Sequence, residues 1–329
     1  MCTAISWKIS SHLFGRTLDL EESYGEETVV VPRRFPLPFR FAGCMAEHYA
    51  MIGTAVSAEG YPLFYDGANE RGLCVAALHF PGNAFYPQKC TSSSRMQEIA
   101  PFEWIPWVLG RCASVREVRD LLSRTVAVSI PFSEAYPLTP LHWIVADGDE
   151  TIVIEPVKEG FAIYDNPTDV LTNNPPFPQQ IFALQPYRCL SVQEAPATFG
   201  GNISFESYSR GMGSLGLPGD FTSPSRFVRA AFLRANMRVM EEGKISAFFH
   251  MMEAVSVPRG CVCLPDGREC FTRYTSCWDS ETETYHTTVY ENRRIRSLSL
   301  RAHDLDSSRL FRYALYTPED TECIHPIDN

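Results

Sequence analysis

CTAISWKISSHLFGRTLDL, residues 2–20, follows Met1 and predicts a β-hairpin. Residues 3–9 alternate enough between apolar and polar side chains to indicate a strand, and residues 13–18 indicate a second strand that returns beside it. Two serines between these strands supply the turn. A hairpin of this kind would place Arg16 and Asp19 near Cys2.

The rest of the chain predicts blocks of strands separated by two helical regions. Strands are expected at residues 27–32, 49–56, 141–146, 151–155, 161–164, 170–172, 274–278, 284–291 and 295–300, and further strands within 61–80, broken by turns at 66–67 and 69–72. Helices are expected at 101–109, 114–123, 224–240 and 245–255, with Ser114 and Glu117 as a capping box and Ser223 or Ser225 as a further cap. This order lacks the regular βαβ alternation of a parallel sheet, so we expect a layered α+β fold with antiparallel sheets.

No repeat or linker divides the 329 residues, so a single domain over 1–329 is expected. Residues 191–214, rich in serine and glycine, have no sustained period and predict a long loop or an extension used in assembly. Lys and Arg number 29 against 39 Asp and Glu, a net charge of −10 without a basic stripe, which argues against nucleic-acid binding.

The chain has no apolar run of about 18 residues and no signal-peptide pattern, so we expect no membrane span and a cytoplasmic protein. Eleven cysteines in such a chain are expected to be free thiols.

Cys2 combines two reactive groups if Met1 is removed. Its α-amine, with an ordinary pKa of about 7.7–8, could then act as the general base for its own thiol. The nucleophile and the base would belong to one residue. The alternative is that Cys2 merely begins a strand.

Five segments carry a family resemblance: MCTAI (1–5), FGRTLDL (14–20), DGANERGL (66–73), LTNNP (171–175) and GLPGDFTSPSRFVRAAF (216–232). In this order and spacing they resemble the choloylglycine hydrolases, which comprise bile salt hydrolases and penicillin V acylases. The resemblance covers nearly the whole chain. It implies an N-terminal nucleophile hydrolase with a four-layer αββα sandwich, which releases glycine or taurine from conjugated bile salts and needs no cofactor or metal. The alternative substrate is penicillin V or another N-acyl amide.

The resemblance also implies roles for the residues of the hairpin. Cys2 occupies the position of the nucleophile. Arg16, in FGR, would lie near the sulfur and favour its thiolate form, because a fixed cation lowers the pKa of a thiol. Asp19 would accept a hydrogen bond from the α-ammonium group and orient it. Without the family, Arg16 and Asp19 would be interpreted as a surface ion pair.

The oxyanion hole is the next feature that the resemblance implies. Asn173, in LTNNP, matches the position whose side-chain amide donates to the oxyanion, and its neighbour Asn174 is the competing candidate. Arg226 matches the remaining polar position of the site, and its alternative is a charge on a helix surface. The backbone N–H of His79 would be the second oxyanion donor.

His79 departs from the family, which usually has Asn here in bile salt hydrolases and Tyr in penicillin V acylases. The side chain therefore does not decide the substrate, although the backbone N–H is retained. An imidazole with an ordinary pKa of about 6.5 predicts a substrate affinity that depends on pH.

Substrate-binding residues are expected in apolar stretches and in the 191–214 extension. The apolar candidates are Leu18, Ile130, Phe132 and Leu138, for which core packing is the alternative. Ser209 and Arg210 lie where the family's selectivity loop falls, and they resemble the form that prefers taurine conjugates. The same extension resembles the family's assembly loop, so a homotetramer is expected.

Two other classes of protein compete with the hydrolase. A zinc-binding module could use four cysteines, Cys261, Cys263, Cys270 and Cys277, but only the first two are close in sequence, unlike the paired spacing of structural zinc sites. A binding protein that kept the fold without the activity is the other alternative, which the full set of polar site residues disfavours.

Overall fold

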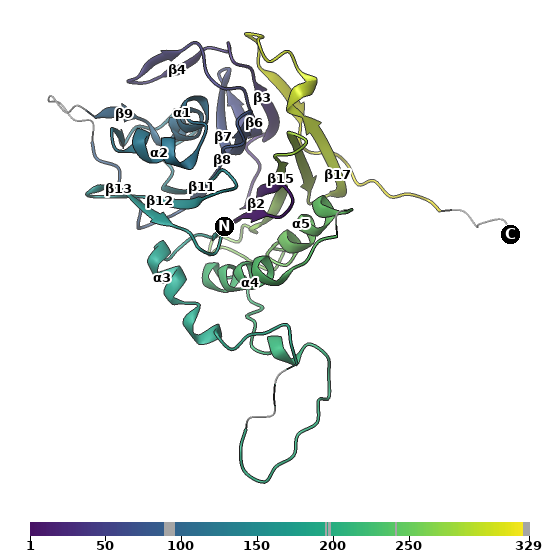
Figure 1. The fold of residues 1–329 in the computed structure, drawn as a ribbon. Helices are drawn as coiled ribbons and strands as arrows, with labels where there is room; N and C mark the ends of the chain where they lie inside the picture. The colour runs from purple at the N-terminus through teal and green to yellow at the C-terminus, as the bar shows by residue number, and fades with distance from the viewer. Residues whose placement is uncertain (89–95, 195, 197–198, 241, 325–329) are drawn as a thin grey trace.

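The computed structural model describes residues 1–88, 96–194, 196, 199–240 and 242–324, and within them two antiparallel sheets form the body of the protein (Figure 1). The smaller sheet has the order β14-β1-β2-β15-β16-β17, formed by Val170–Leu171, Cys2–Lys8, His12–Leu20, Phe271–Asp279, Thr284–Val289 and Asn292–Ser299. The larger sheet has the order β13-β12-β11-β8-β7-β6-β3-β18, formed by Gly160–Asp165, Thr151–Val157, Leu141–Ala146, Cys74–His79, Tyr61–Asn69, Met51–Ala58, Glu27–Val31 and Phe311–Ala314.

Helices cover the outer face of each sheet (Figure 1). The larger sheet is covered by α1 (Trp104–Arg111) and α2 (Val115–Leu122), and the smaller sheet by α4 (Ser223–Asn236) and α5 (Lys244–Glu253). Smaller elements are β4 (Leu37–Phe39), β5 (Gly43–Met45), β9 (Gln97–Ile99), β10 (Thr125–Ala127) and α3 (Phe177–Phe182). The four layers confirm the expected α+β fold, an αββα sandwich.

Buried side chains explain why strands of the larger sheet are apolar on both faces. In β3, Val29 and Val31 pack in the core below α1 and α2, whereas Val30 packs in the core between the two sheets. Alternation along a strand sends neighbouring side chains to opposite faces. A strand with helices on one face and a second sheet on the other therefore needs the unbroken β-branched run that the sequence has.

Most predicted elements are confirmed. The turn expected at 66–67 is wrong, because these residues pair with β6 inside the continuous strand β7. The helices differ in three respects. The fourth helix ends at Asn236 instead of residue 240, and its N-cap is Thr222 without a side-chain cap bond, so the cap expected at Ser223 or Ser225 is wrong. Those hydroxyls bind elsewhere: Ser225 Oγ donates to Asp220 Oδ2 at 2.6 Å, and Ser223 Oγ donates to a threonine of the 171–175 segment. Helix α3 was not predicted, since prolines surround its start.

The 191–214 extension leaves the body of the protein between α3 and α4 (Figure 1). Its described part is irregular apart from a 3-10 turn at Met212–Ser214, and residues 195, 197 and 198 lie outside the described residues. Among the described helices, none is long and apolar enough to cross a bilayer. The ten cysteines that the structure describes are all free thiols.

Gly15 allows two strands of the smaller sheet to approach closely. A Cβ at this position would lie 1.9 Å from the carbonyl oxygen of Ser276 in β15, which no side chain tolerates. Glycine is therefore required immediately before Arg16, and it brings Arg16 close to the centre of the sandwich.

A buried carboxylate joins the two sheets. Asp66, on β7 of the larger sheet, accepts hydrogen bonds from Tyr274 at 2.5 Å, Ser276 at 2.8 Å and Tyr285 at 2.5 Å, all on the smaller sheet. Burial raises the pKa of Asp66, although Arg16 and the three hydroxyl groups oppose the shift. These hydrogen bonds offset part of the free-energy cost of burying the carboxylate.

We predict that Asp66→Ala lowers the free energy of unfolding by about 3–5 kcal/mol, because it removes the shared acceptor of three buried hydroxyl groups and the neighbour of a buried arginine. Urea denaturation followed by circular dichroism measures this loss. The control is Asp149→Ala, since Asp149 is exposed and should change stability by less than about 0.5 kcal/mol. Equal effects of the two substitutions would contradict the prediction.

Candidate active site

A cavity of about 430 Å³ opens beside the first residues of β1. Its lining includes Met1, Cys2 and Arg16 together with side chains of β2, β7, β8 and the segment 130–141. The N-terminus lies at the middle of the molecule (Figure 1). The cavity therefore combines a possible nucleophile with room for a substrate.

The backbone of Cys2 is held on both sides. Cys2 is only 3% exposed, and its N–H donates to Oδ1 of Asn173 at 2.8 Å. Its carbonyl accepts from Nη1 of Arg226 at 2.5 Å, and Nη2 of Arg226 donates to the same Asn173 oxygen at 2.8 Å. The structure thus brings together three of the residues that the sequence predicts for the site.

Arg16 is fully buried, and backbone carbonyls hold its guanidinium. Nε donates to Thr17 at 3.2 Å, and Nη1 donates to Tyr65 at 3.1 Å and to Ala77 at 2.5 Å. Nη2 has no hydrogen-bond partner among the described residues. Burial lowers the pKa of Arg16, but interactions with the neighbouring Cys2, Tyr274, Asp66 and Asp19 raise it more. A fixed cation of this kind in turn stabilises a thiolate.

Asp19 is a buried carboxylate beside the N-terminus of the chain. Its Oδ1 accepts from Thr272 at 2.7 Å, whereas Oδ2 has no hydrogen-bond partner in the described structure and lies 4.0 Å from Nη1 of Arg226. The α-amine of Met1 donates to the backbone carbonyl of Asp19 at 2.6 Å. Burial lowers the pKa of this amine, but Cys2 and Asp19 raise it more. Asp19 therefore has an acceptor oxygen to spare beside the N-terminus.

Asn173, and not Asn174, contacts Cys2. The Nδ2 group of Asn173 donates to the carbonyl of His79 at 2.8 Å, which leaves its second hydrogen available. Asn174 instead donates to Pro81 at 2.8 Å. The competing candidate therefore lies outside the contacts of Cys2.

The backbone N–H of His79 points away from β11. Phe80, the next residue, donates to the carbonyl of Pro140 at 2.8 Å, and His79 lies opposite Leu141. In an antiparallel ladder, residues next to a hydrogen-bonded pair turn their backbone groups to the other side. On that side the pairing with β7 has ended, and the His79 carbonyl accepts from Asn173. The N–H of His79 therefore faces the side of Asn173, as an oxyanion donor requires.

All four apolar candidates line the cavity: Leu18, Ile130, Phe132 and Leu138. Five further aromatic residues of the same wall were not predicted: Tyr24, Phe64, Tyr65, Phe102 and Tyr136. Their sequence neighbourhoods resemble ordinary core or loop segments, so only the tertiary contacts assign them to the cavity. The wall is mostly apolar, as expected for a site that binds a hydrophobic acyl group.

Two predicted substrate residues are not in this group. Ser209 and Arg210 are exposed on the extension and are absent from the cavity lining of the described chain.

The four cysteines of the zinc alternative differ in burial, because Cys270 and Cys277 are buried and Cys261 and Cys263 are exposed. Within the described residues, no group of three or more His, Cys, Asp or Glu side chains could hold a metal ion.

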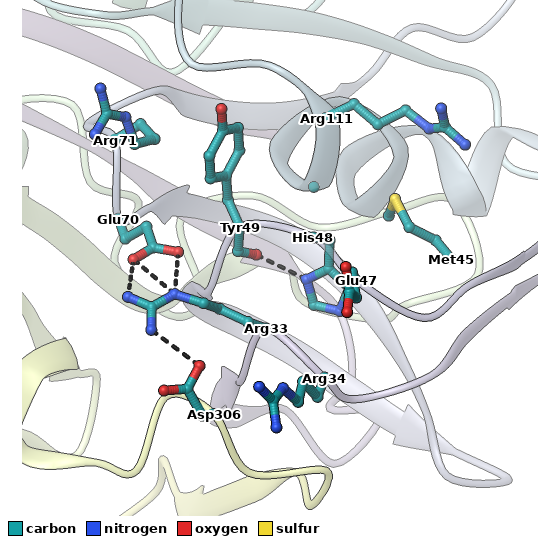
Figure 2. A pocket seen from close by; sticks show the side chains of 11 residues that line it. Arg33, Arg34, Met45, Glu47, His48, Tyr49, Glu70, Arg71, Arg111 and Asp306 are labelled. Carbon is teal, nitrogen blue, oxygen red and sulfur yellow. Dashed lines mark hydrogen bonds and ion pairs between the residues drawn. The ribbon is translucent and has the colours of Figure 1, made fainter.

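A second cavity, of about 810 Å³, shares no residue with the first (Figure 2). Arg33 forms a two-pronged ion pair with Glu70 and a further bond to Asp306 at 3.2 Å. Figure 2 shows the other arginines spread around the rim without converging on one point. The larger cavity therefore holds mainly structural ion pairs, and the reactive groups belong to the smaller one.

Comparison with known proteins agrees with this geometry. A profile described as "Linear amide C-N hydrolases, choloylglycine hydrolase family" matches residues 2–313. A bile salt hydrolase/transferase from Lactiplantibacillus plantarum is 47% identical over 317 residues, which cover 96% of this chain and 97% of the relative. Another from Clostridium perfringens is 35% identical over 319 residues, covering 95% and 96%.

Solved structures have the same fold. A variant of conjugated bile acid hydrolase from Clostridium perfringens superposes with a TM-score of 0.92 at 32% identity, covering 99% of this chain and all of the other. Penicillin V acylase from Agrobacterium tumefaciens has a TM-score of 0.73 at 20% identity, covering 95% and 90%, and shares the fold. The chain therefore belongs to the choloylglycine hydrolase family, whose members are amidohydrolases that act on linear amides.

Proposed function

We propose that this protein hydrolyses the amide bond of conjugated bile salts, with Cys2 as nucleophile after removal of Met1. The observation that carries the proposal is a single cavity in which Cys2 and Arg16 face four apolar side chains of a substrate wall. Relatives at 47% and 35% identity carry the name bile salt hydrolase/transferase. A steroid acyl group matches the apolar wall in chemical character.

In the first step the thiol of Cys2 gives its proton to its own α-amine, and the sulfur attacks the amide carbonyl. The negative charge moves to the carbonyl oxygen, where the N–H of His79 and the free hydrogen of the Asn173 amide stabilise it. Arg16 favours the thiolate. Asp19 accepts from the α-ammonium through the oxygen that lacks a partner in the described structure.

In the second step the tetrahedral intermediate collapses, and the C–N bond breaks. The α-ammonium of Cys2 gives its proton to the leaving nitrogen, which departs as glycine or taurine. The acyl group remains on the sulfur as a thioester. Water, deprotonated by the regenerated amine, then attacks the thioester and releases the bile acid, so that the thiol is restored.

The extension supports a homotetramer. Its described part exposes large apolar side chains, with Phe199 80% and Tyr208 81% accessible, and Leu215, which directly follows the extension in the sequence, is 74% accessible. Large apolar side chains exposed along one extension favour an interface with another chain. The preference for taurine conjugates, expected from Arg210, and the cytoplasmic location stay predictions.

We predict that the purified wild type, shown by mass spectrometry to lack Met1, releases glycine or taurine from conjugated bile salts. Cys2→Ser should lower kcat by about 1,000-fold or more, because a hydroxyl is a weaker nucleophile than a thiol. Cys44→Ser, which changes an exposed cysteine outside the cavity, is the matched control and should keep full activity. Turnover of penicillin V alone would keep the mechanism and refute the substrate.

We predict that His79 makes binding of the anionic substrate depend on pH. Loss of solvation lowers the pKa of His79, so the imidazole is neutral near pH 7 and gains its charge only below about pH 6.5. KM should then fall as the pH falls, because the protonated ring attracts the anion. His79→Asn should remove this change, and identical KM profiles for the two proteins would refute the role.

Light scattering should give a mass close to four chains for the wild type. Replacing both Phe199 and Tyr208 with serine should shift the protein to smaller species, because it removes apolar surface from the expected interface. A monomeric wild type would contradict the tetramer.

A further inference from the structure

One buried imidazole lies between the two halves of the oxyanion hole. His142, on β11, is fully buried and absent from the cavity lining. Its ring stacks on Phe80, with centroids 4.2 Å apart and an angle of 6° between the planes. Its Nε2 lies 2.8 Å from the carbonyl oxygen of Thr172. Phe80 directly follows His79, and Thr172 directly precedes Asn173.

We propose that His142 is a positioning residue that fixes the distance between the two oxyanion donors, the backbone N–H of His79 and the side-chain amide of Asn173. The inference rests on the proposed function, because it takes these two groups as the donors. His142 acts through its neighbours and touches no substrate.

Histidine has both properties that this position uses. The carbonyl of Thr172 can only accept, so Nε2 must carry a proton and donate it. The flat face of the ring covers Phe80 at the same time. Phenylalanine could provide the face without the donor, and glutamine could provide a donor without the face. The two contacts can therefore be removed separately.

Glu155, beside the other edge of the ring, connects β11 to the start of α3. Nδ1 of His142 lies 3.5 Å from Oε1 of Glu155, and the same oxygen accepts from the backbone N–H of Phe177 at 2.8 Å. Gln180 holds the far side, where its Nε2 donates to the carbonyl of Asn173 at 2.6 Å. The segment that contains Asn173 is therefore bound both by β11 and by α3.

Oxyanion donors act mainly in the transition state, so a small displacement lowers kcat more than it raises KM. Misplacement by about 1 Å can cost about 100-fold in rate. Alkylation of Cys2 by iodoacetamide forms no oxyanion, because it displaces iodide at a saturated carbon. The alkylation rate therefore reports the thiol and its surroundings without the oxyanion hole.

The experiment compares wild type, His142→Phe and His142→Gln for kcat and KM on glycocholate and taurocholate, and for alkylation of Cys2 by iodoacetamide. We expect kcat to fall by about 10–100-fold in both variants, while KM and the alkylation rate stay close to wild type. Phe80→Leu keeps the bond to Thr172 and should give a smaller loss of kcat. It also provides a second test if a histidine variant does not fold.

The matched control is His12→Gln. His12 is also a buried histidine, 3% exposed and hydrogen-bonded to Ser6 at 2.9 Å. It lies at the opposite end of the β1–β2 hairpin from Cys2. Its kcat should equal that of wild type. Unchanged kcat in the folded His142 and Phe80 variants would overturn the inference, as would a parallel loss of alkylation. Failure of the proposed function is recognised separately, by an inactive wild type or an active Cys2→Ser.

Discussion

The guanidinium of Arg226 connects the parts of the site that lie farthest apart in the sequence. It is fully buried in α4 and donates to the carbonyl of Cys2, to the hydroxyl of Thr3 at 2.6 Å and to the side chain of Asn173. Burial lowers the pKa of Arg226, and Asp19 is the main opposing charge. Because an unpaired charge in this place would be costly, the first strand, the 171–175 segment and α4 must come together for any of them to be stable.

The site divides into a rigid polar end and an apolar end made of loops. The groups around Cys2 lie on strands or are bound to backbone, which gives the precision that catalysis needs. The apolar wall of the cavity is formed largely by the segment 130–141, with Phe132 and Tyr136 in ring contact. Arg40, outside the cavity, donates to the carbonyl of Phe132 at 2.7 Å and so holds this wall in place. Loops on a rigid scaffold can vary in specificity while the chemistry stays constant.

Sequence patterns predicted the layered fold well wherever a segment has the hydrophobic periodicity of a single strand or a single helix. The capping residue Ser114 accepts from the backbone of Glu117 at 3.3 Å as expected, because a cap is a local interaction. The cap of α4 was wrong because Ser223 and Ser225 form bonds to other segments, which no local pattern reveals. The sequence could not decide which of Asn173 and Asn174 contacts Cys2, because both are asparagines. Only the folded structure shows where each side chain points.

The sequence by itself determined the chemistry that this protein can carry: a cysteine at the position after Met1, an arginine and an aspartate on the strand that returns beside it, and an order of strands and helices without βαβ alternation. These are properties of single residues and of short-range periods. The tertiary structure alone decided that the N–H of His79 turns away from β11 and that Asn173, not Asn174, contacts Cys2. It also decided that His142 contacts Phe80 and Thr172, the sequence neighbours of His79 and Asn173. Such contacts depend on strand register across many tens of residues, and register is set by the packing of the whole sandwich.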